Sequence, residues 1–373
     1  MLLIQTNRDA LLKPLQCVIG IVERRHTLPI LTNVLIEKNG NILSVLATDL
    51  EIQITATSVC SDETPDFSVT VAAKKLQDIC KAFPENAQIS LKTEETRLQI
   101  KVGKSRFNLQ TLPTTDFPTI VPTSENRSIV KISQRTLKNL LNQVQYAMAQ
   151  QDIRYYLNGL LLVIEPALLR VVATDGHRLS MVSHPLEEDT QTTKNLTQEV
   201  ILPRKTVIEL IKLLGDSEDE ISLEIGQNHT RVSFSNIVLV SKIVEGKFPD
   251  YNRVVPSNYQ NQMQLDRMNL LQALQRAAIL SNEKFRGVRL VLTQNNLRVI
   301  CNNNEQEEAQ EDIEVNYTGD PLDIGFNVNY LLDVLMNVSN ESIVISFGDA
   351  NSSGLFTVPG NEYFKYVVMP MRI

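Results

Sequence analysis

The segment "ATDGHRLS" (residues 173–180) has a relative 126 residues earlier in the chain, "ATDLEIQI" (residues 47–54). A second pair has nearly the same spacing, since Phe117-Pro118 in "TLPTTDFPTIVP" and Phe248-Pro249 in "KIVEGKFPDYNRVVP" lie 131 residues apart. This period is far longer than that of a solenoid repeat, so each unit should be a domain with its own core. An internal repeat of domain size therefore decides the fold.

Two kinds of segment have the apolar spacing of amphipathic helices, and each kind occurs three times. The first kind is "NRDALLKPLQCV" (7–18), "SQRTLKNLLNQV" (133–144) and "LDRMNLLQALQRA" (265–277), and the second is "AAKKLQDICKAF" (72–83), "PRKTVIELIKLL" (203–214) and "NVNYLLDVLMNV" (327–338). Helical periodicity puts Leu11, Leu12 and Leu15 on one face of the first, and Leu137, Leu140, Leu141 and Val144 on one face of its second copy. These faces should pack on sheets.

Short alternating stretches between the helices predict β-strands. In "VLIEKNGNILSVLATD" (34–49) the Asn-Gly-Asn at 39–41 is a hairpin signal. Two helices and about eight short strands per unit predict an α+β fold of three repeated domains, with the helices packed on antiparallel sheets. We expect the domains to span residues 1–125, 126–254 and 255–373.

Composition narrows the class of protein. The four cysteines of the 373 residues are scattered, with no CxxC pair and no histidine at metal-ligand spacing, so we expect no metal and no cofactor. Free cysteines fit a reducing cytoplasm. The apolar start "MLLI" is too short for a signal peptide, and no run reaches the roughly 20 apolar residues of a membrane helix. We therefore expect a cytoplasmic protein with no membrane partner.

Charge is distributed unevenly along the chain. The net charge is −7, which argues against nucleic-acid binding when taken alone. The six helical segments (7–25, 72–83, 133–150, 203–214, 266–280 and 327–338) nevertheless carry 14 Lys and Arg against 6 Asp and Glu. Helices favour Glu as strongly as Lys, so propensity does not explain this excess. It predicts an electropositive helical face, for which phosphate backbone is the natural ligand.

Further motifs indicate a family. In order they are "LPILTNVLIE" (28–37), "MAQQDIRYYLNG" (148–159), "ATDGHRLS", "PRKTVIELIKLL", "FPDYNRVVP" (248–256), "AAILSNEKFRGVRL" (277–290), "EQEEAQE" (305–311) and "YVVMPMRI" (366–373). Together they resemble the bacterial DNA sliding clamps, the β subunits of DNA polymerase III, over the whole chain. The resemblance implies a homodimeric, head-to-tail ring of six domains that encircles duplex DNA without reading its sequence and confers processivity.

The resemblance also implies three sets of site residues and the partners that they bind. A hydrophobic pocket would capture short linear peptides of the replicative polymerase, the clamp loader and repair polymerases, and it would consist of Arg154, Leu157, Thr174, Gly176, His177, Arg178, Leu179, Pro249, Arg253, Val254, Val367, Val368, Met369, Pro370 and Met371. The residues that face DNA would be Arg25, Lys74, Gln151, Tyr155, Arg204 and Lys205, and the dimer interface would pair Phe107 and Leu109 with Ile279 and Leu280. Two residues, Gln150 and Ile373, depart from the usual family residues, His and Leu.

Three interpretations of the turn Asp175–Arg178 remain. An acid, a histidine and an arginine together suggest catalysis, but no GxSxG, P-loop or HExxH motif accompanies them. The first copy has Ala-Thr-Asp at the same place, which favours a plain strand end and turn. The resemblance adds a pocket wall, so we expect no catalytic residues. The alternatives are a protein-docking scaffold that binds no DNA, and an enzyme that depends on His177.

Overall fold

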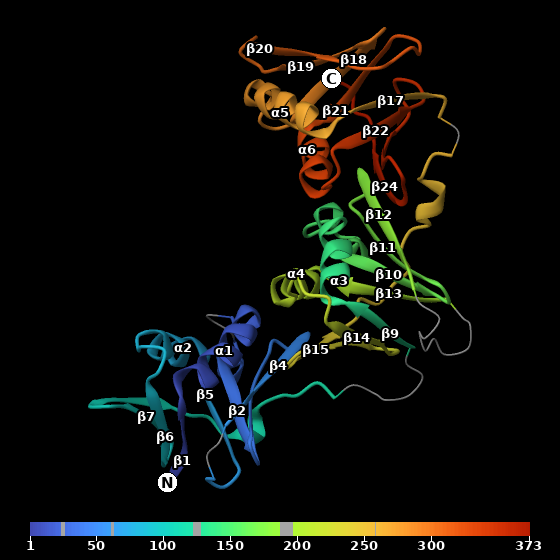
Figure 1. The fold of residues 1–373 in the computed structure, drawn as a ribbon. Helices are drawn as coiled ribbons and strands as arrows, with labels where there is room; N and C mark the ends of the chain where they lie inside the picture. The colour runs from blue at the N-terminus through green and yellow to red at the C-terminus, as the bar shows by residue number, and fades with distance from the viewer. Residues whose placement is uncertain (24–26, 61–62, 122–127, 187–196, 258) are drawn as a thin grey trace. The chain divides into compact units, whose positions relative to one another are not determined.

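The computed structural model describes the chain except for residues 24–26, 61–62, 122–127, 187–196 and 258 (Figure 1). The described residues form two compact units, and each is described by itself. Unit 1 contains Met1–Lys138 and Ile208–Ile243, and unit 2 contains residues 139–186, 197–207 and Val244–Ile373.

Unit 1 has two antiparallel sheets. One has the order β1-β6-β7-β8, with β1 at Leu2–Asn7, β6 at Gln88–Glu94, β7 at Arg97–Val102 and β8 at Ser105–Gln110. The other has the order β5-β2-β3-β4-β16-β15-β14-β9. Its strands are β5 (Phe67–Ala72), β2 (Asn33–Asn39), β3 (Ile42–Thr48), β4 (Ile52–Val59), β16 (Ile237–Lys242), β15 (His229–Phe234), β14 (Glu220–Ile225) and β9 (Ser128–Ser133).

Unit 2 repeats this arrangement. Its eight-stranded sheet has the order β13-β10-β11-β12-β24-β23-β22-β17, and its four-stranded sheet has the order β20-β19-β18-β21. The strands are β13 (Gln198–Pro203), β10 (Gly159–Glu165), β11 (Leu168–Thr174), β12 (Arg178–Pro185), β24 (Asn361–Val368), β23 (Gly354–Val358), β22 (Ser342–Phe347), β17 (Asn261–Asp266), β20 (Glu308–Glu314), β19 (Asn296–Asn302), β18 (Gly287–Thr293) and β21 (Leu322–Asn327).

Six α-helices occur within the described ranges, one at each predicted segment. They are α1 (Arg8–Val18), α2 (Ala73–Lys81), α3 (Gln134–Asn142), α4 (Arg204–Leu213), α5 (Arg267–Ala277) and α6 (Val328–Asn337). The first helix of each repeat is followed by a 3₁₀ turn: η1 (Ile19–Ile21), η4 (Gln145–Ala147) and η8 (Ala278–Leu280). The α-helical part is therefore shorter than the segments 7–25 and 133–150 suggested, because the chain tightens into these turns.

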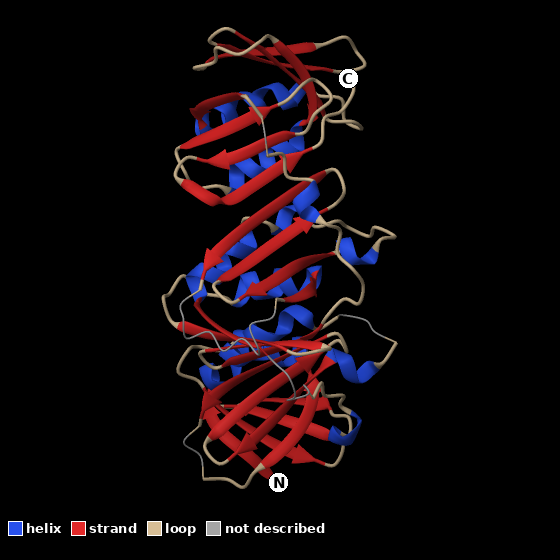
Figure 2. Cartoon of the chain, turned by 90° about the vertical axis from the view of Figure 1, so that its right-hand side faces the viewer, coloured by secondary structure: helices blue, strands red, loops and turns tan. Residues whose placement is uncertain are grey.

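Local chemistry explains where the elements begin. The side chain of Asn7 accepts a hydrogen bond from the N–H of Asp9 at 2.9 Å, and Asp266 caps α5 in the same manner. Gly40 has φ +59° in the hairpin between β2 and β3, as the Asn-Gly signal predicted. The predicted apolar faces of the first helix and its second copy are buried. Within each unit, Figure 2 shows the strands in front and the helices behind them.

The repeat is visible in the strand order. Numbered within a repeat, strands one, six, seven and eight pair in that order, and strands five, two, three and four pair in that order, in all three copies. Each copy has eight strands and two α-helices in the described chain. The predicted α+β fold of three repeated domains, with helices on antiparallel sheets, is thereby confirmed.

Candidate functional site

Unit 2 contains an apolar cavity of about 210 Å³ beside the turn Asp175–Arg178. Its walls come from the β11–β12 turn, from η5 (Tyr155–Leu157), from the segment around η7 (Tyr251–Arg253) and from the end of β24. The lining residues are Arg154, Leu157, Thr174, Gly176, Arg178, Leu179, Pro249, Tyr251, Val254, Val367 and Met369. Segments far apart in the sequence thus form one concave surface, which is the usual form of a ligand site.

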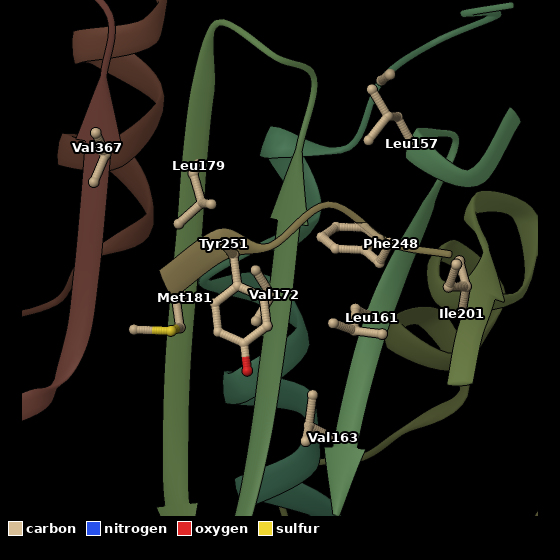
Figure 3. Packing of buried hydrophobic residues seen from close by; sticks show 11 residues of the cluster. Leu157, Leu161, Val163, Val172, Leu179, Met181, Ile201, Phe248, Tyr251 and Val367 are labelled. Atoms are coloured by element: carbon tan, nitrogen blue, oxygen red, sulfur yellow. The ribbon is translucent and has the colours of Figure 1, made fainter. Parts of the chain in front are cut away.

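The floor of the cavity is a packed hydrophobic cluster (Figure 3). Leu157, Leu179 and Val367 are each at most 2% exposed. The Tyr251 ring packs in the same cluster, and its hydroxyl accepts a hydrogen bond from Nη1 of Arg170 at 3.0 Å. Since the polar end of Tyr251 is satisfied, its ring can be held rigidly as part of the floor. An apolar side chain that enters the cavity therefore meets a preformed surface.

The turn itself is held by side-chain hydrogen bonds to its own backbone. Oδ1 of Asp175 accepts from the N–H groups of His177 (2.9 Å) and Arg178 (3.0 Å), and Oγ1 of Thr174 accepts from Gly176 N–H at 3.1 Å. Gly176 has φ +89°, the left-handed region that favours glycine. A Cβ there would lie 3.2 Å from Nη1 of Arg154.

The first repeat has the same turn. Oδ1 of Asp49 accepts from Glu51 N–H at 3.0 Å and Ile52 N–H at 2.7 Å, and Leu50 has φ +77° where the second copy has glycine. Thr48 also bonds as its second copy does, with its hydroxyl donating to Ile52 O at 2.9 Å. The interpretation of Ala-Thr-Asp as a strand end and turn is therefore supported in both copies.

Arg178 lines the cavity, but its guanidinium points into the protein. Its guanidinium pairs with Asp175 at 3.1 Å and with Asp333 of α6, donates to Tyr146 O at 2.6 Å, and lies 4.4 Å from the centre of the Tyr330 ring. Burial works against its charge, but Tyr366 and Asp333 outweigh burial and raise the pKa of Arg178. It forms a permanent positive hub in the wall of the cavity.

Arg154 is the exposed cation of the cavity. Its Nε and Nη2 donate to the two carboxylate oxygens of Asp152 at 3.0 Å and 2.8 Å. Hydrogen bonds from Arg154 lower the pKa of Asp152 to about 2, so the pair stays ionised at any physiological pH. A fixed cation at the edge of an apolar cavity suits a ligand with a carbonyl or carboxylate beside apolar side chains.

The side chain of His177 is exposed, and its backbone forms hydrogen bonds within the structure. Its carbonyl accepts from the N–H of Met369 at 2.8 Å, which joins the turn to the chain after β24. The backbone N–H of His177 donates to Asp175, and among the side-chain hydrogen bonds of the described chain none joins the imidazole to a serine or cysteine. A general base needs such a partner. The hydrogen bonds found for His177 are those of its backbone, which hold the turn.

Ten of the fifteen predicted pocket residues line the cavity, and five do not. Arg253 points to solvent and pairs with Asp250 at 2.9 Å. Met371 lines a separate cavity of about 320 Å³ with Arg372 and Ile373, where it was expected to face a ligand in the first cavity. The remaining predicted residues that do not line the cavity are His177, Val368 and Pro370. Sequence reasoning missed Tyr251, although it follows Phe248-Pro249 in the repeated motif.

Two further observations concern metal ligands and membrane-spanning helices. In the part of the chain that the structure describes, no three His, Cys, Asp or Glu side chains are grouped so that they could hold a metal ion. No described helix is long and apolar enough to cross a membrane.

Comparison with known proteins connects this geometry to a family. Residues 2–121, 131–250 and 252–372 match the N-terminal, central and C-terminal domains of the DNA polymerase III beta subunit. The chain belongs to the DNA polymerase III beta subunit family. The beta sliding clamp of Pseudomonas aeruginosa is 47% identical over 369 residues, which cover 98% of this chain and 99% of that protein.

Solved structures of the beta subunit family agree with the fold. The DNA polymerase III subunit beta from Pseudomonas aeruginosa superposes with a TM-score of 0.95 at 46% identity, covering 100% of both chains. A sliding clamp from the same organism bound to griselimycin matches with a TM-score of 0.94 at 46% identity, again over 100% of both chains.

The residues that the family resemblance assigned to DNA have varied surroundings. Arg25 lies outside the described residues. Lys74 lies on α2 and pairs with Asp78 at 3.1 Å. Gln151 is exposed with φ +56°, and Tyr155 is exposed on η5. Arg204 and Lys205 begin α4, where burial lowers the pKa of Arg204 and Nη1 of Arg204 donates to Met148 O at 3.2 Å.

Of the residues assigned to the beta subunit dimer interface, two lie on the edge strand β8 and two lie on the turn η8, which contacts the edge strand β20. Phe107 and Leu109 are half-buried on β8, and Phe107 meets Phe83 edge-on at 6.1 Å. Ile279 is 78% exposed, and Leu280 is half-buried, on the turn η8. Ile279 is therefore no core residue of the single chain. In the described chain, β8 pairs with β7 alone and β20 with β19 alone.

Proposed function

We propose that two copies of this chain close into a ring around duplex DNA and act as a sliding clamp of replication. The ring would hold DNA by topology and by attraction to phosphates, and it would tether polymerases through peptides bound in the apolar cavity. The clamp would catalyse no reaction itself. The observation that carries this proposal is the pattern of strand pairing between the repeats.

Two repeats are always joined through the same strands. The fourth strand of the first repeat, β4, pairs with the eighth of the second, β16, and β12 pairs with β24 in the same antiparallel manner. The fourth strand of the third repeat is β20, and the eighth of the first is β8, and each ends a sheet. A free edge is an aggregation hazard unless it is covered. Head-to-tail pairing of β20 with β8 of a second copy covers both edges in a closed assembly.

The internal seams predict the register of this pairing. Leu239 lies opposite Ile54 at the first seam, and Tyr366 lies opposite Ser180 at the second. The hairpin registers make Phe107 the counterpart of Leu239 and Tyr366, and Ala309 the counterpart of Ile54 and Ser180. We therefore expect Phe107 to lie opposite Ala309 of the second copy.

Side-chain contacts at the second seam point the same way. The ring of Tyr146, the middle residue of η4, lies 5.7 Å from the ring of Tyr366. The middle residue of η8 is Ile279. We accordingly expect Ile279 to pack on Phe107 of the second copy, with Leu280 and Leu109 completing the apolar contact. Burial of these side chains supplies the free energy of closure.

Charge would set the orientation of the two copies. The edge strand β20 contains four acidic residues. The other edge strand, β8, contains Arg106, and Lys104 lies just before it. Antiparallel pairing would bring these opposite charges together. Complementary edges guide association and suppress wrong pairings.

DNA contact would be weak at each residue and additive over the ring. The excess of basic residues on the helical segments supports an electropositive inner face made by Lys74, Arg204, Lys205 and Arg25, with Gln151 and Tyr155 beside them. A ring that slides needs phosphate attraction without base readout. Of these residues, Arg204 has a backbone partner that competes with phosphate.

The apolar cavity would receive short linear peptides of the replicative polymerase, the clamp loader and repair polymerases. Its size suits two or three apolar side chains, and Met369 provides an adaptable wall for different ligands. We keep His177, Arg253, Val368, Pro370 and Met371 as residues near a bound peptide outside the cavity itself. We also propose that the domain boundaries lie between residues 125 and 126 and between residues 254 and 255. We propose that the protein acts in the cytoplasm, where bacterial DNA is replicated.

The decisive experiment compares DNA of two topologies. Protein loaded by a clamp loader on nicked circular plasmid should remain with the plasmid in gel filtration and leave when a restriction enzyme linearises the DNA. Equal retention on both forms would exclude topological binding and favour a scaffold that touches DNA otherwise, or not at all. Loss of a hydrolytic activity with His177 would instead revive the enzyme alternative.

A further inference from the structure

Residues 369–373 leave the end of β24 and lie against the four-stranded sheet of unit 2. Alternate side chains of β18 and β21 in this sheet are buried, including Val288, Leu290, Ile324 and Phe326. Their neighbours occupy the opposite, outer face. There, two of the positions are glycines, Gly287 on β18 and Gly325 on β21.

The two glycines lie on the same face. Gly325 is directly opposite Arg289, and Gly287 is directly opposite Asn327, so all four residues share the outer face. The glycines themselves contribute no side chain to this face. The Arg289–Asp323 ion pair lies beside them on the same face. The glycines therefore form a shallow seat, which we call the glycine seat.

Ile373 fills the glycine seat. A Cβ added at Gly325 would lie 2.4 Å from the carbonyl oxygen of Met371 and 2.8 Å from Cδ1 of Ile373. A Cβ added at Gly287 would lie 3.1 Å from the same Cδ1. The N–H of Met371 also donates to Gly325 O at 2.8 Å. At this sheet the segment is thus held by one backbone hydrogen bond and one apolar side chain.

This anchoring bears on the first cavity because Met369 is one of its walls. On one side Met369 is held through its N–H to His177 O, and on the other side it is held two residues later at Gly325. A short segment outside a strand frays unless it is tied down. We propose that the glycine seat, by holding Ile373, positions Met369 for peptide binding, so that Ile373 is a positioning residue of the clamp. This rests on the proposed role of the first cavity.

If the glycine seat positions Met369, four substitutions should change peptide affinity to different extents. Gly325→Ala would displace the Met371 carbonyl, so peptide affinity should fall by about tenfold or more, as the competent position becomes rare. Ile373→Ala would remove a half-exposed anchor, and we expect a loss of about fivefold. Gly287→Ala meets only the flexible end of Ile373 and should change affinity by less than about twofold. Ile373→Leu should restore the anchor and bind as the unchanged protein does.

The test is titration calorimetry with the pentapeptide Gln-Leu-Ser-Leu-Phe. It is combined with amide hydrogen exchange on each full-length variant. The Met371 amide should exchange faster in Ile373→Ala and Gly325→Ala, while amides of the buried face stay protected. Melting temperatures show whether each variant folds. Met369→Ala reports on the cavity itself and should weaken binding whether or not the seat matters.

The outcomes separate the two proposals. If Met369→Ala weakens the peptide and Ile373→Ala does not, the positioning role is wrong while the cavity assignment stands. If the unchanged protein does not bind the peptide, the cavity assignment fails, and the positioning role fails with it. If Gly287→Ala instead weakens binding as much as Gly325→Ala, the close approach of the Met371 carbonyl to Gly325 has no special effect. The glycine seat then does not act as described.

Discussion

Replacing Ile279 with alanine separates ring closure from folding. In the single chain Ile279 is 78% exposed, so its side chain contributes little to the core of its own domain. In the proposed ring it packs on Phe107 of the second copy. The substitution should therefore weaken association and leave the fold nearly unchanged.

The magnitude follows from the atoms removed. Ile279→Ala deletes three carbon atoms, worth about 0.8 kcal/mol each when buried, or about 2 kcal/mol at one seam. A closed dimer contains this contact twice, so association should weaken by about 4–5 kcal/mol. That corresponds to a rise of about a thousandfold in the dissociation constant. The free energy of unfolding of a chain should change by no more than about 0.5 kcal/mol, as for other exposed sites.

Mass photometry over a dilution series measures the dissociation constant, and urea unfolding of the monomer measures stability. Ile153→Ala is the matched control, since Ile153 is 96% exposed and lies outside the proposed seam. It should leave both quantities unchanged. If Ile279→Ala lowers the free energy of unfolding by about 2 kcal/mol and leaves association intact, Ile279 belongs to a core in solution, and the seam argument is wrong.

Three other outcomes are expected. Lys74→Ala with Lys205→Ala should make the salt dependence of DNA binding shallower, by up to about four in the log–log slope for the two copies, and an unchanged slope would mean that neither lysine meets phosphate. His177→Ala should weaken the peptide less than Met369→Ala in calorimetry, because its side chain does not line the cavity; a larger effect would contradict that geometry. Arg178→Ala should lower the free energy of unfolding in urea by about 3 kcal/mol, because two partly buried carboxylates lose their partner, and a neutral result would refute its role as a hub.

Much of the fold could be predicted from local pattern. The apolar spacing that put Leu11 and Leu15 on one helical face, and the Asn-Gly pair at the first hairpin, depend on a few neighbouring residues. Both were confirmed, because helix faces and tight turns are decided within about four residues. The domain-sized repeat needed no structure either, since recurring motifs at fixed spacing are a property of the sequence alone.

The candidate site could be predicted only in part. Most lining residues were found through the family resemblance, but the directions of side chains were not. Arg178 was assigned to the pocket, but its burial could not be predicted, because Asp333 of α6 reaches it from another repeat. Met371 looked like a ligand contact and lies in a different cavity. Tyr251 was missed because nothing local marks it as part of a cavity floor.

By itself, the sequence determined the three repeats, their helices and the excess of basic residues on those helices. Only the tertiary structure decided which side chains share a cavity, which edges stay unpaired and where the segment after β24 lies. The reason is physical. Cavity walls and strand edges depend on pairing between distant segments, such as Arg178 opposite Val368. A change of register by one residue turns every side chain of a strand to the other face, and no local pattern encodes that choice completely.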